Sequence, residues 1–308
     1  MTELFQYALR RALRMAGGIL VAMSFMFALL WVVPDGPFLD QAELISASKG
    51  CEPTGDIFEE YGALLGSWGL FEPSTCAGQS RVFPGRAIYV LVVDAFPVTL
   101  VLVATAMLAA LVLGGTLGIA AAAWPSSIAA RICQGLHALG IAVPNVVLGP
   151  LLVLVFSLQL GWFPPALGAD THSWVLPAIT LGTACAGGIA DVLHRALLAS
   201  LWSAPVLLAR TQGASRWRLL TRYVARDAVL PVLTFLGPAT SSLLAGTLIV
   251  EGLFALPGLG SLFVAAAMGF DLGLVCAVVL VYMALFMGSG LLQDILYGVL
   301  DPRVRFDV

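Results

Sequence analysis

The sequence predicts an all-α polytopic membrane protein, on the strength of its composition and of the way its apolar residues are arranged. Hydrophobic residues make up 60% of the 308 residues, and charged residues make up only 11%. Soluble domains are about half apolar and about a quarter charged. The mean hydropathy is +0.97, and the apolar residues form long uncharged runs. This pattern indicates that lipid is the solvent for most of the chain.

Six apolar runs are long enough to cross a bilayer, for which a helix needs about 20 mostly apolar residues. They are residues 15–33, 96–124, 132–160, 174–193, 230–254 and 272–297. The second and third runs exceed a single crossing, so we expect these helices to tilt or to extend beyond the bilayer. The first run is longer than the apolar core of a secretory signal, about 7–15 residues, and no small-x-small cleavage site follows it. We therefore interpret it as a retained span.

Lysine and arginine are divided unevenly between the two sides that six spans define. Only three of the 15, Lys49, Arg81 and Arg86, lie on one side, all in a single long loop. The side that carries both chain ends holds the remaining twelve: Arg10, Arg11, Arg14, Arg131, Arg195, Arg210, Arg216, Arg218, Arg222, Arg226, Arg303 and Arg305. Cytoplasmic segments hold the excess of cations, so both termini are expected in the cytoplasm. A basic segment enclosed by spans, without a basic domain around it, does not indicate nucleic-acid binding.

The long loop of residues 34–95 is expected outside the cytoplasm, as an acidic loop or small subdomain. It contains Cys51 and Cys76, which could form a disulfide in an oxidising compartment; two free thiols are the alternative. Cys133, Cys185 and Cys276 lie in or beside the spans and are expected to be small packing residues.

The segment between the fourth and fifth spans is the only sizeable cytoplasmic loop that the topology predicts. Ser203 and Pro205 suit a helix start, and Gly213 suits a helix end in the left-handed conformation. These signals predict a short helix over residues 204–211.

Ser215 then starts a second, basic helix, in which Arg218, Arg222 and Arg226 recur at a spacing of four and share a face. Pro231 is expected at the entry to the fifth span. The alternative is that these arginines only obey the positive-inside rule and contact lipid phosphates. That alternative leaves the ordered capping residues and the glycine unexplained.

Several short stretches along the chain form a recognisable series by their order and spacing. They are VVPDGP (32–37), FPVTLVL (96–102), IAVPNVVLGPLLVLVF (141–156), GWFP (161–164), LARTQG (208–213), YVARDAVLP (223–231), VEGLFALPGLG (250–260) and LDPRVR (300–305). Together they resemble the dipeptide/oligopeptide (DppB/OppB-type) permease family of binding-protein-dependent ABC importers. The glycine-centred cytoplasmic loop that ends in a proline resembles the EAA loop of that family. Residues 204–209, Ala-Pro-Val-Leu-Leu-Ala, are more apolar than the acidic-Tyr-Val-Arg-Thr-Ala run that is common in the family.

The resemblance implies a type I importer permease fold and an architecture divided along the chain. The parts are a cytoplasmic segment (1–14), a first span (15–33), the outer loop (34–95), a permease core (96–298) with a coupling loop at about 199–229, and a cytoplasmic tail (299–308). The residues of the coupling loop that are expected to couple the permease to a partner ATPase are Ser203, Pro205, Leu208, Ala209, Arg210, Gly213, Arg218, Arg222, Arg226 and Pro231.

The resemblance also implies partners. These are a second, related permease subunit, two cytoplasmic ATPase subunits that use ATP and Mg, and an extracytoplasmic binding protein that delivers di- or oligopeptides. Haem or nickel complexes are alternative cargo. The chain has no phosphate-binding loop of the G-x-x-x-x-G-K-[ST] type, so we expect a transport subunit of the cell membrane and not an enzyme. We expect it to bind no cofactor and no metal, since His137, His172 and His194 lack metal-ligand spacing.

Polar residues of the fifth span provide candidates for a translocation path or gate: Thr240, Ser241, Ser242, Thr247 and Glu251. The alternative is close helix packing, which favours small residues. Asp191, Glu251 and Asp294 could instead relay protons in a secondary transporter. The alternative interpretation is that these acids have structural roles. No inverted repeat supports such a transporter, and no nucleophile or metal cluster supports a membrane-embedded enzyme.

Overall fold

The computed structural model describes residues 2–32, 79–80, 82–124, 126–165, 171–201, 203–215, 218–219, 225–269 and 271–300. Most of the predicted outer loop, with Cys51 and Cys76, lies outside these residues. In the described part the chain is helical, and its one β feature is an isolated antiparallel bridge between Gln79 and Ala87. The all-α prediction is therefore confirmed for this part of the chain.

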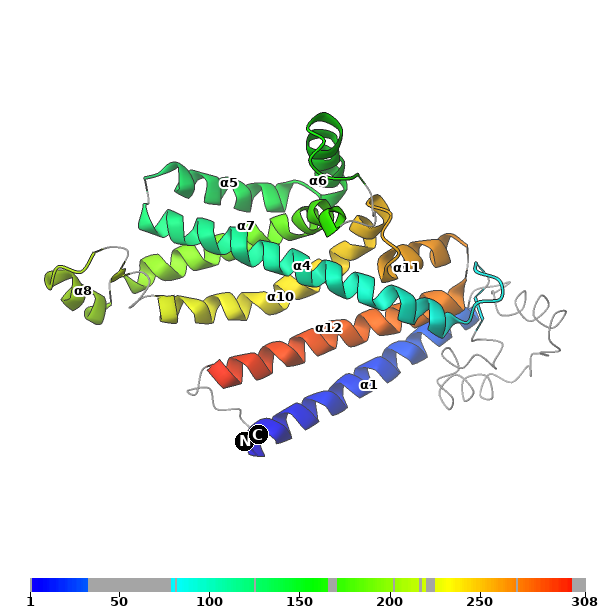
Figure 1. Cartoon of the computed structure of the whole chain (residues 1–308). Coiled ribbons are helices and arrows are strands. Elements are labelled where there is room, and N and C mark those ends of the chain that lie inside the picture. The colour runs from blue at the N-terminus through cyan, green and yellow to red at the C-terminus, as the bar shows by residue number, and fades with distance from the viewer. Residues whose placement is uncertain are drawn as a thin grey trace. The chain divides into compact units, whose positions relative to one another are not determined.

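The elements follow one another as a series of helices (Figure 1). They are α1 (Thr2–Val32), α4 (Ile88–Ala123), α5 (Ile128–Ala142), α6 (Asn145–Leu152), the π-helix η2 (Val153–Gln159), the 3-10 helix η3 (Thr171–Trp174), α7 (Val175–Ser200), α8 (Ala204–Thr211), α10 (Ala225–Leu253), α11 (Leu259–Met268) and α12 (Leu272–Leu300). Among the described residues four stretches are long and apolar enough to cross a membrane: Ile88–Ala123, His172–Ser200, Ala228–Leu253 and Gly273–Leu296. These correspond to the second, fourth, fifth and sixth predicted spans, and the count of six stays a prediction.

The chain divides into two compact units. Unit 1 comprises Met1–Tyr7, Leu100–Ala255 and Ser289–Val308, and unit 2 comprises Ala8–Thr99 and Leu256–Gly288. In unit 1 the long helix α7 packs against α5, α6 and α10. It is the most buried of the candidate spans, with 67% of its apolar window inside the structure.

Glycines on α4 and small residues on α7 allow the two helices to approach closely. A Cβ atom added at Gly114 would lie 2.5 Å from the carbonyl oxygen of Ala186, and one at Gly118 would lie 2.8 Å from that of Ala190. A glycine of α7 contacts α4 in the same way. A Cβ atom at Gly182 would lie 2.6 Å from the carbonyl oxygen of Ala106. Small residues at a spacing of four thus line both sides of this contact, as is typical of membrane helix pairs.

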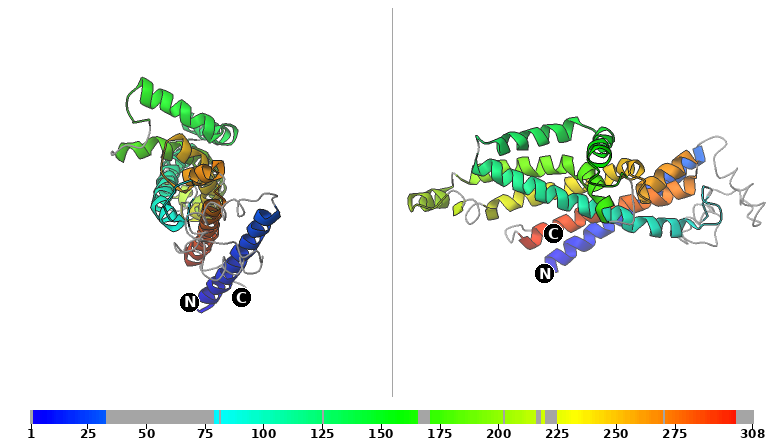
Figure 2. Two further views of the ribbon diagram at one scale, coloured as in Figure 1. Left: turned by 90° about the vertical axis from the view of Figure 1, so that its right-hand side faces the viewer. Right: turned by 45° about the horizontal axis from the view of Figure 1, so that its top comes forward.

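The third predicted span, residues 132–160, is not one continuous helix, so the expectation of a single long helix was wrong; its crossing of the membrane stays a prediction. α5 ends at Ala142 and α6 begins at Asn145, with Pro144 between them in extended conformation at φ −61° and ψ 144°. A proline cannot donate to the preceding turn and disfavours helical geometry in the residue before it. The carbonyl of Pro144 accepts from the N–H groups of Val147 and Leu148 at 2.9 and 3.0 Å, which starts the new helix. In the left view of Figure 2, α6 and η2 run across the direction of the neighbouring helices of their unit.

Three further boundaries differ from the sequence prediction. α4 begins at Ile88, inside the predicted outer loop. α10 begins at Ala225, so Pro231 lies within the helix and not at its entry. α11, Leu259–Met268, falls between two predicted spans, because ten residues are too few to be counted as a crossing.

Buried polar side chains fasten the segments of unit 2. One carboxylate oxygen of Asp271 accepts from the hydroxyl of Ser80 at 2.6 Å, and the other accepts from the N–H of Leu274 at 3.1 Å, in the first turn of α12. The hydroxyl of Thr99 on α4 accepts from the N–H of Leu259 at 2.8 Å and so caps α11. Because Asp271 and Thr99 are fully buried, these bonds satisfy helix-terminal groups that no solvent reaches.

Candidate functional site

The candidate site is built around α8, the short helix that the sequence predicted at residues 204–211 and that the structure confirms with these bounds. Pro205 occupies its first turn, as expected. The predicted hydroxyl cap is wrong, because the side chain of Ser203 makes no capping hydrogen bond. The proline has no N–H for that hydroxyl to accept, and the N–H of Val206 donates instead to the backbone carbonyl of Ser203 at 3.1 Å.

The C-terminus of α8 closes on Gly213, which adopts φ +82°. The N–H of Gly213 donates to the carbonyl of Arg210, and the N–H of Ala214 donates to the carbonyl of Ala209, both at 3.1 Å. This pair of bonds is the Schellman motif, which satisfies carbonyls that would otherwise be unpaired at a helix end. The chain is therefore turned back sharply after two turns of helix, as the glycine predicted.

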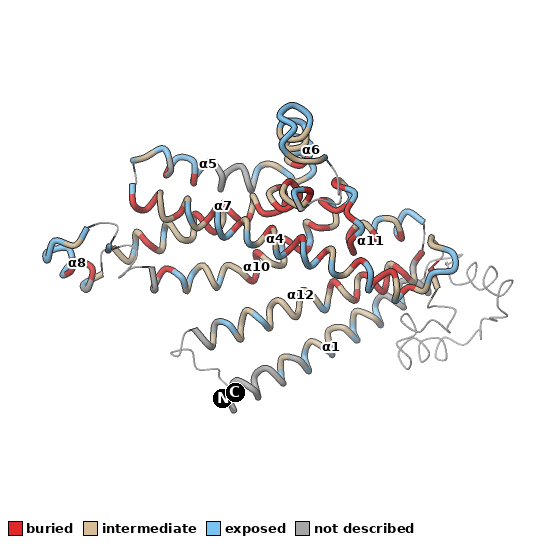
Figure 3. The backbone as a smooth tube through the Cα atoms, in the orientation of Figure 1, coloured by how far each residue is buried: buried red, intermediate tan, exposed pale blue. Residues whose placement is uncertain are grey.

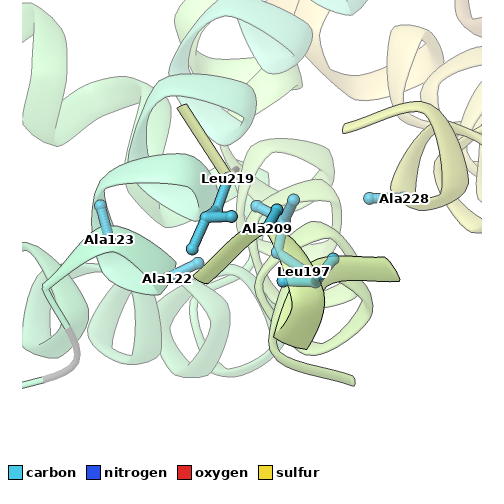
Figure 4. Packing of buried hydrophobic residues seen from close by; sticks show 7 residues of the cluster. Ala122, Ala123, Leu197, Ala209, Leu219 and Ala228 are labelled. Carbon is cyan, nitrogen blue, oxygen red and sulfur yellow. The ribbon is translucent and has the colours of Figure 1, made fainter. Parts of the chain in front are cut away.

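One face of α8 is seated on the end of the helix bundle of unit 1. Val206 and Ala209, three residues apart, are 2% and 4% exposed. They belong to a buried cluster that we call the seat, shown in Figure 4. Its members are Ala122 and Ala123 at the end of α4, Leu197 of α7, Val206, Ala209, Leu219 and Ala228 of α10. A displacement of α8 would therefore act on the ends of α4, α7 and α10 together.

The opposite face of α8 is open. Leu207 is 40% exposed and Leu208 63% exposed, and Arg210 is also exposed. Figure 3 shows both kinds of surface on this one short helix. In Figure 1, α8 lies beyond the ends of α7 and α10 in its unit. An exposed apolar pair beside an arginine, on a helix held from behind, is a surface suited to contact with another protein.

The structure separates the residues that the sequence grouped together in this loop. Leu208, Arg210 and Gly213 are exposed, whereas Ala209 is buried in the seat. Leu207 was missed, since no pattern within eight residues reveals which of several adjacent apolar side chains faces outward. Only the contacts with α4, α7 and α10 decide that.

The beginning of the predicted second helix is present after Gly213. The hydroxyl of Ser215 accepts from the N–H of Arg218 at 3.4 Å, which is the capping geometry expected of a serine before a helix. Arg218 is exposed. Arg222 lies outside the described residues, as does the side chain of Arg226 in α10, so their shared face stays a prediction. Pro231 is exposed within α10.

The five candidate passage residues do not share one face of α10. Thr240, Thr247 and Glu251 are on the side that includes the buried positions, and Thr247 and Glu251 are fully buried. The hydroxyls of Thr240 and Thr247 donate to the carbonyls of Leu236 and Leu244, both at 2.7 Å. Ser242 is exposed and Ser241 is half-buried.

Of the acids in the spans, Asp191 is paired along its own helix. It forms an ion pair with Arg195 at a spacing of four residues on α7, an arrangement that neutralises its charge locally. Among the described residues no group of three His, Cys, Asp or Glu side chains could hold a metal ion.

A cavity of about 400 Å³ lies next to the seat, between α4, α7 and α10. Its lining is apolar, with Leu111, Ile189, Leu197 and Val232 among the residues. Such a lining offers no hydrogen-bond partners to a polar molecule.

Comparison with known proteins identifies the family of this chain. Residues 114–306 match the family described as binding-protein-dependent transport system inner membrane component. The chain belongs to this family. The matched range includes α8, the seat and α10.

Full-length relatives of this transport family are similar to the chain. The oligopeptide transport system permease protein OppB of Haemophilus influenzae is 30% identical, covering 98% of this chain and 100% of the relative. OppB of Escherichia coli is 28% identical over 98% of this chain and 100% of the relative. The dipeptide transport system permease protein DppB of Lactococcus lactis is 28% identical, over 97% and 99%.

Membership of the family makes the chain an inner-membrane transport component and not an enzyme. The alternative of a proton-coupled secondary transporter is not favoured by these comparisons.

Proposed function

We propose that this chain is a permease subunit of an ATP-driven ABC importer that carries di- or oligopeptides across the cytoplasmic membrane. The observation that carries the proposal is the two-sided helix α8. One of its faces contacts the ends of three bundle helices, and the other exposes Leu207 and Leu208. The peptide cargo is supported by the relatives, which are oligopeptide and dipeptide permeases.

In this proposal the permease has six spans with both termini in the cytoplasm, and the coupling loop occupies about residues 199–229. Its partners are a second permease subunit, two cytoplasmic ATPase subunits that use ATP and Mg, and an extracytoplasmic binding protein. The exposed face of α8 docks on one ATPase subunit. When ATP closes the ATPase pair, the seat transmits the displacement of α8 to α4, α7 and α10, and the access of the passage changes sides.

We further propose that the polar side chains of α10 contribute to the passage. Ser242 is the candidate best placed to contact cargo, because it is exposed in the isolated chain. The other candidates lie closer to the packed side of the helix: Thr240, Ser241, Thr247 and Glu251. Of these, Glu251 acts near the outer gate. A disulfide between Cys51 and Cys76 is proposed for the outer loop.

The docking role of α8 is tested by Leu208→Ser in the assembled transporter. Because apolar anchors at the centre of an interface carry much of its binding energy, we expect retention of the ATPase to weaken about ten-fold, which corresponds to about 1.4 kcal/mol. Uptake of a labelled dipeptide or oligopeptide should fall with it. Both quantities are measured on the purified complex, by co-purification and after reconstitution with the binding protein.

Ile128→Ser is the matched control, since Ile128 at the start of α5 is 70% exposed but does not lie on α8. Equal losses in the two variants would refute a specific docking role for α8. Unchanged ATPase retention and uptake in Leu208→Ser would refute it as well. Uptake driven by a proton gradient with no ATPase present would overturn the proposed function as a whole.

A further inference from the structure

One turn of α10 lacks a hydrogen bond that an uninterrupted helix would have. Pro238 lies within the helix, and a proline has no N–H to donate to the carbonyl four residues earlier. That carbonyl belongs to Thr234. We call residues 234–238 the proline turn.

The side chain of Gln293 on α12 supplies the missing donor. Its amide Nε2 donates to the carbonyl oxygen of Thr234 at 2.8 Å, and more weakly to that of Leu233 at 3.4 Å. Both partners lie in candidate spans, Ala228–Leu253 and Gly273–Leu296, and both lie in unit 1. In lipid, where water cannot satisfy a free carbonyl, prolines in membrane helices are tolerated when a neighbouring helix provides such a partner.

Gly237 makes the space for this contact. A Cβ atom at this position would overlap the side-chain amide of Gln293, with its oxygen, carbon and nitrogen as the three nearest atoms. The glycine, the proline and the glutamine therefore form one arrangement. The proline frees a carbonyl, the glycine opens the helix surface beside it, and the glutamine of α12 enters and donates.

We propose that Gln293 is a positioning residue that holds the proline turn of α10 against α12. Proline interrupts the backbone ladder, so this turn is where α10 bends most easily, and Figure 1 shows that α10 changes direction along its length. The hydrogen bond of Gln293 fixes the bend and makes the C-terminal half of α12 follow it. α10 begins at the seat of α8, so the proline turn lies between the seat and the polar stretch of α10 that starts at Thr240. This inference goes beyond the proposed function, and only its transport measurement rests on that proposal.

A double-mutant cycle on the full-length protein tests the assignment. Gln293→Met keeps the size of the side chain and removes the donor, and Pro238→Ala returns an N–H to the helix so that Thr234 regains its partner. We expect Gln293→Met to lower the thermal-unfolding midpoint in detergent by a few degrees in the Pro238 background. In the Pro238→Ala background the same change should have less than half of that effect, because the carbonyl no longer needs Gln293.

A second pair of variants tests the space that Gly237 provides. Gly237→Ala should displace Gln293 and lower the midpoint as Gln293→Met does. Gly252→Ala, on the same helix with nothing within 4 Å of its added Cβ, should leave the midpoint unchanged or raise it. Equal effects of Gln293→Met in the two proline backgrounds, or equal effects of the two glycine variants, would overturn the inference.

The transport measurement separates positioning from stability alone. In reconstituted transporters we expect Gln293→Met to lower the peptide imported per ATP hydrolysed about 2- to 10-fold, the range that one hydrogen bond of ordinary net strength gives. The double variant should recover most of this loss. An unchanged ratio, with the midpoint lowered as above, would show that Gln293 only stabilises the helix pair and would overturn its positioning role. If the chain imported no peptide at all, the proposed function would fail. The double-mutant cycle of unfolding midpoints would still test the hydrogen bond between Gln293 and Thr234.

Discussion

Gly213 determines where α8 ends. Its φ of +82° lies in the left-handed region, which a side chain makes unfavourable by about 1–2 kcal/mol. An added Cβ would have nothing within 4 Å, so the backbone conformation alone requires glycine here. The sequence indicated this position because glycine after a short periodic segment is the commonest helix end. The burial of Ala209 and the exposure of Leu207 could not be foreseen, because the seat that covers one and leaves the other open is formed by residues of α4, α7 and α10.

The conformational requirement at Gly213 is tested by comparing two substitutions. Gly213→Ala should destabilise the end of α8 by about 1–2 kcal/mol, and Gly213→Asn should cost less, because asparagine tolerates the left-handed region. Peptide uptake and the rate of backbone hydrogen exchange in residues 204–214 are the measurements. Equal behaviour of the two variants would show that the φ of Gly213 does not limit α8.

At the scale of elements, α4 and α7 depend on the absence of side chains at their contact. Gly114 and Gly118 lie so close to the carbonyl oxygens of Ala186 and Ala190 that a side chain at either position would overlap them. Length and hydropathy alone did not predict where the third apolar run is divided into two helices. The apolar run 132–160 looks like one span, yet Pro144 divides it into α5 and α6. A proline in a long apolar run can kink a helix or end it, and the surrounding helices decide which.

Neighbouring glycines of α4 should respond to the same substitution with opposite signs. Gly118→Ala places a Cβ 2.8 Å from the carbonyl oxygen of Ala190, an overpacking that costs about 1–3 kcal/mol. Gly115→Ala meets nothing within 4 Å and gains about 0.5–1 kcal/mol of helix propensity. Thermal unfolding of the two purified variants in the same detergent measures the difference. A lower midpoint for Gly115→Ala than for Gly118→Ala would contradict the packing of α4 on α7.

At the scale of the whole molecule, function depends on which ends of the helices face the cytoplasm. The distribution of twelve of the 15 lysines and arginines predicts that α8 lies inside the cell. The family places the chain in the inner membrane. The coupling proposal requires that α8 be reached only from the cytoplasm, and that the segment before α4 be reached from outside.

Thiol labelling tests this orientation. With Cys51 and Cys76 replaced by serine, the three remaining cysteines, Cys133, Cys185 and Cys276, are buried and should not react. We expect a membrane-impermeant maleimide to label Pro84→Cys in intact cells, and Gln212→Cys only after permeabilisation; both positions are exposed. Labelling of Gln212→Cys in intact cells would reverse the topology and exclude docking on a cytoplasmic ATPase.

The sequence by itself determined the solvent, the helical class, the short helix of residues 204–211 and the resemblance to the transport family. These depend on local composition, on backbone preferences of proline and glycine, and on patterns read along the chain. The tertiary structure alone decided that α8 is held by its Val206 and Ala209 face and presents Leu207 and Leu208, and that Gln293 donates to Thr234. Both outcomes join residues far apart in sequence, such as Ala122 with Ala209 and Thr234 with Gln293. Such pairs form only when the helices pack, because the free energy of contact between distant segments is not encoded in either segment alone.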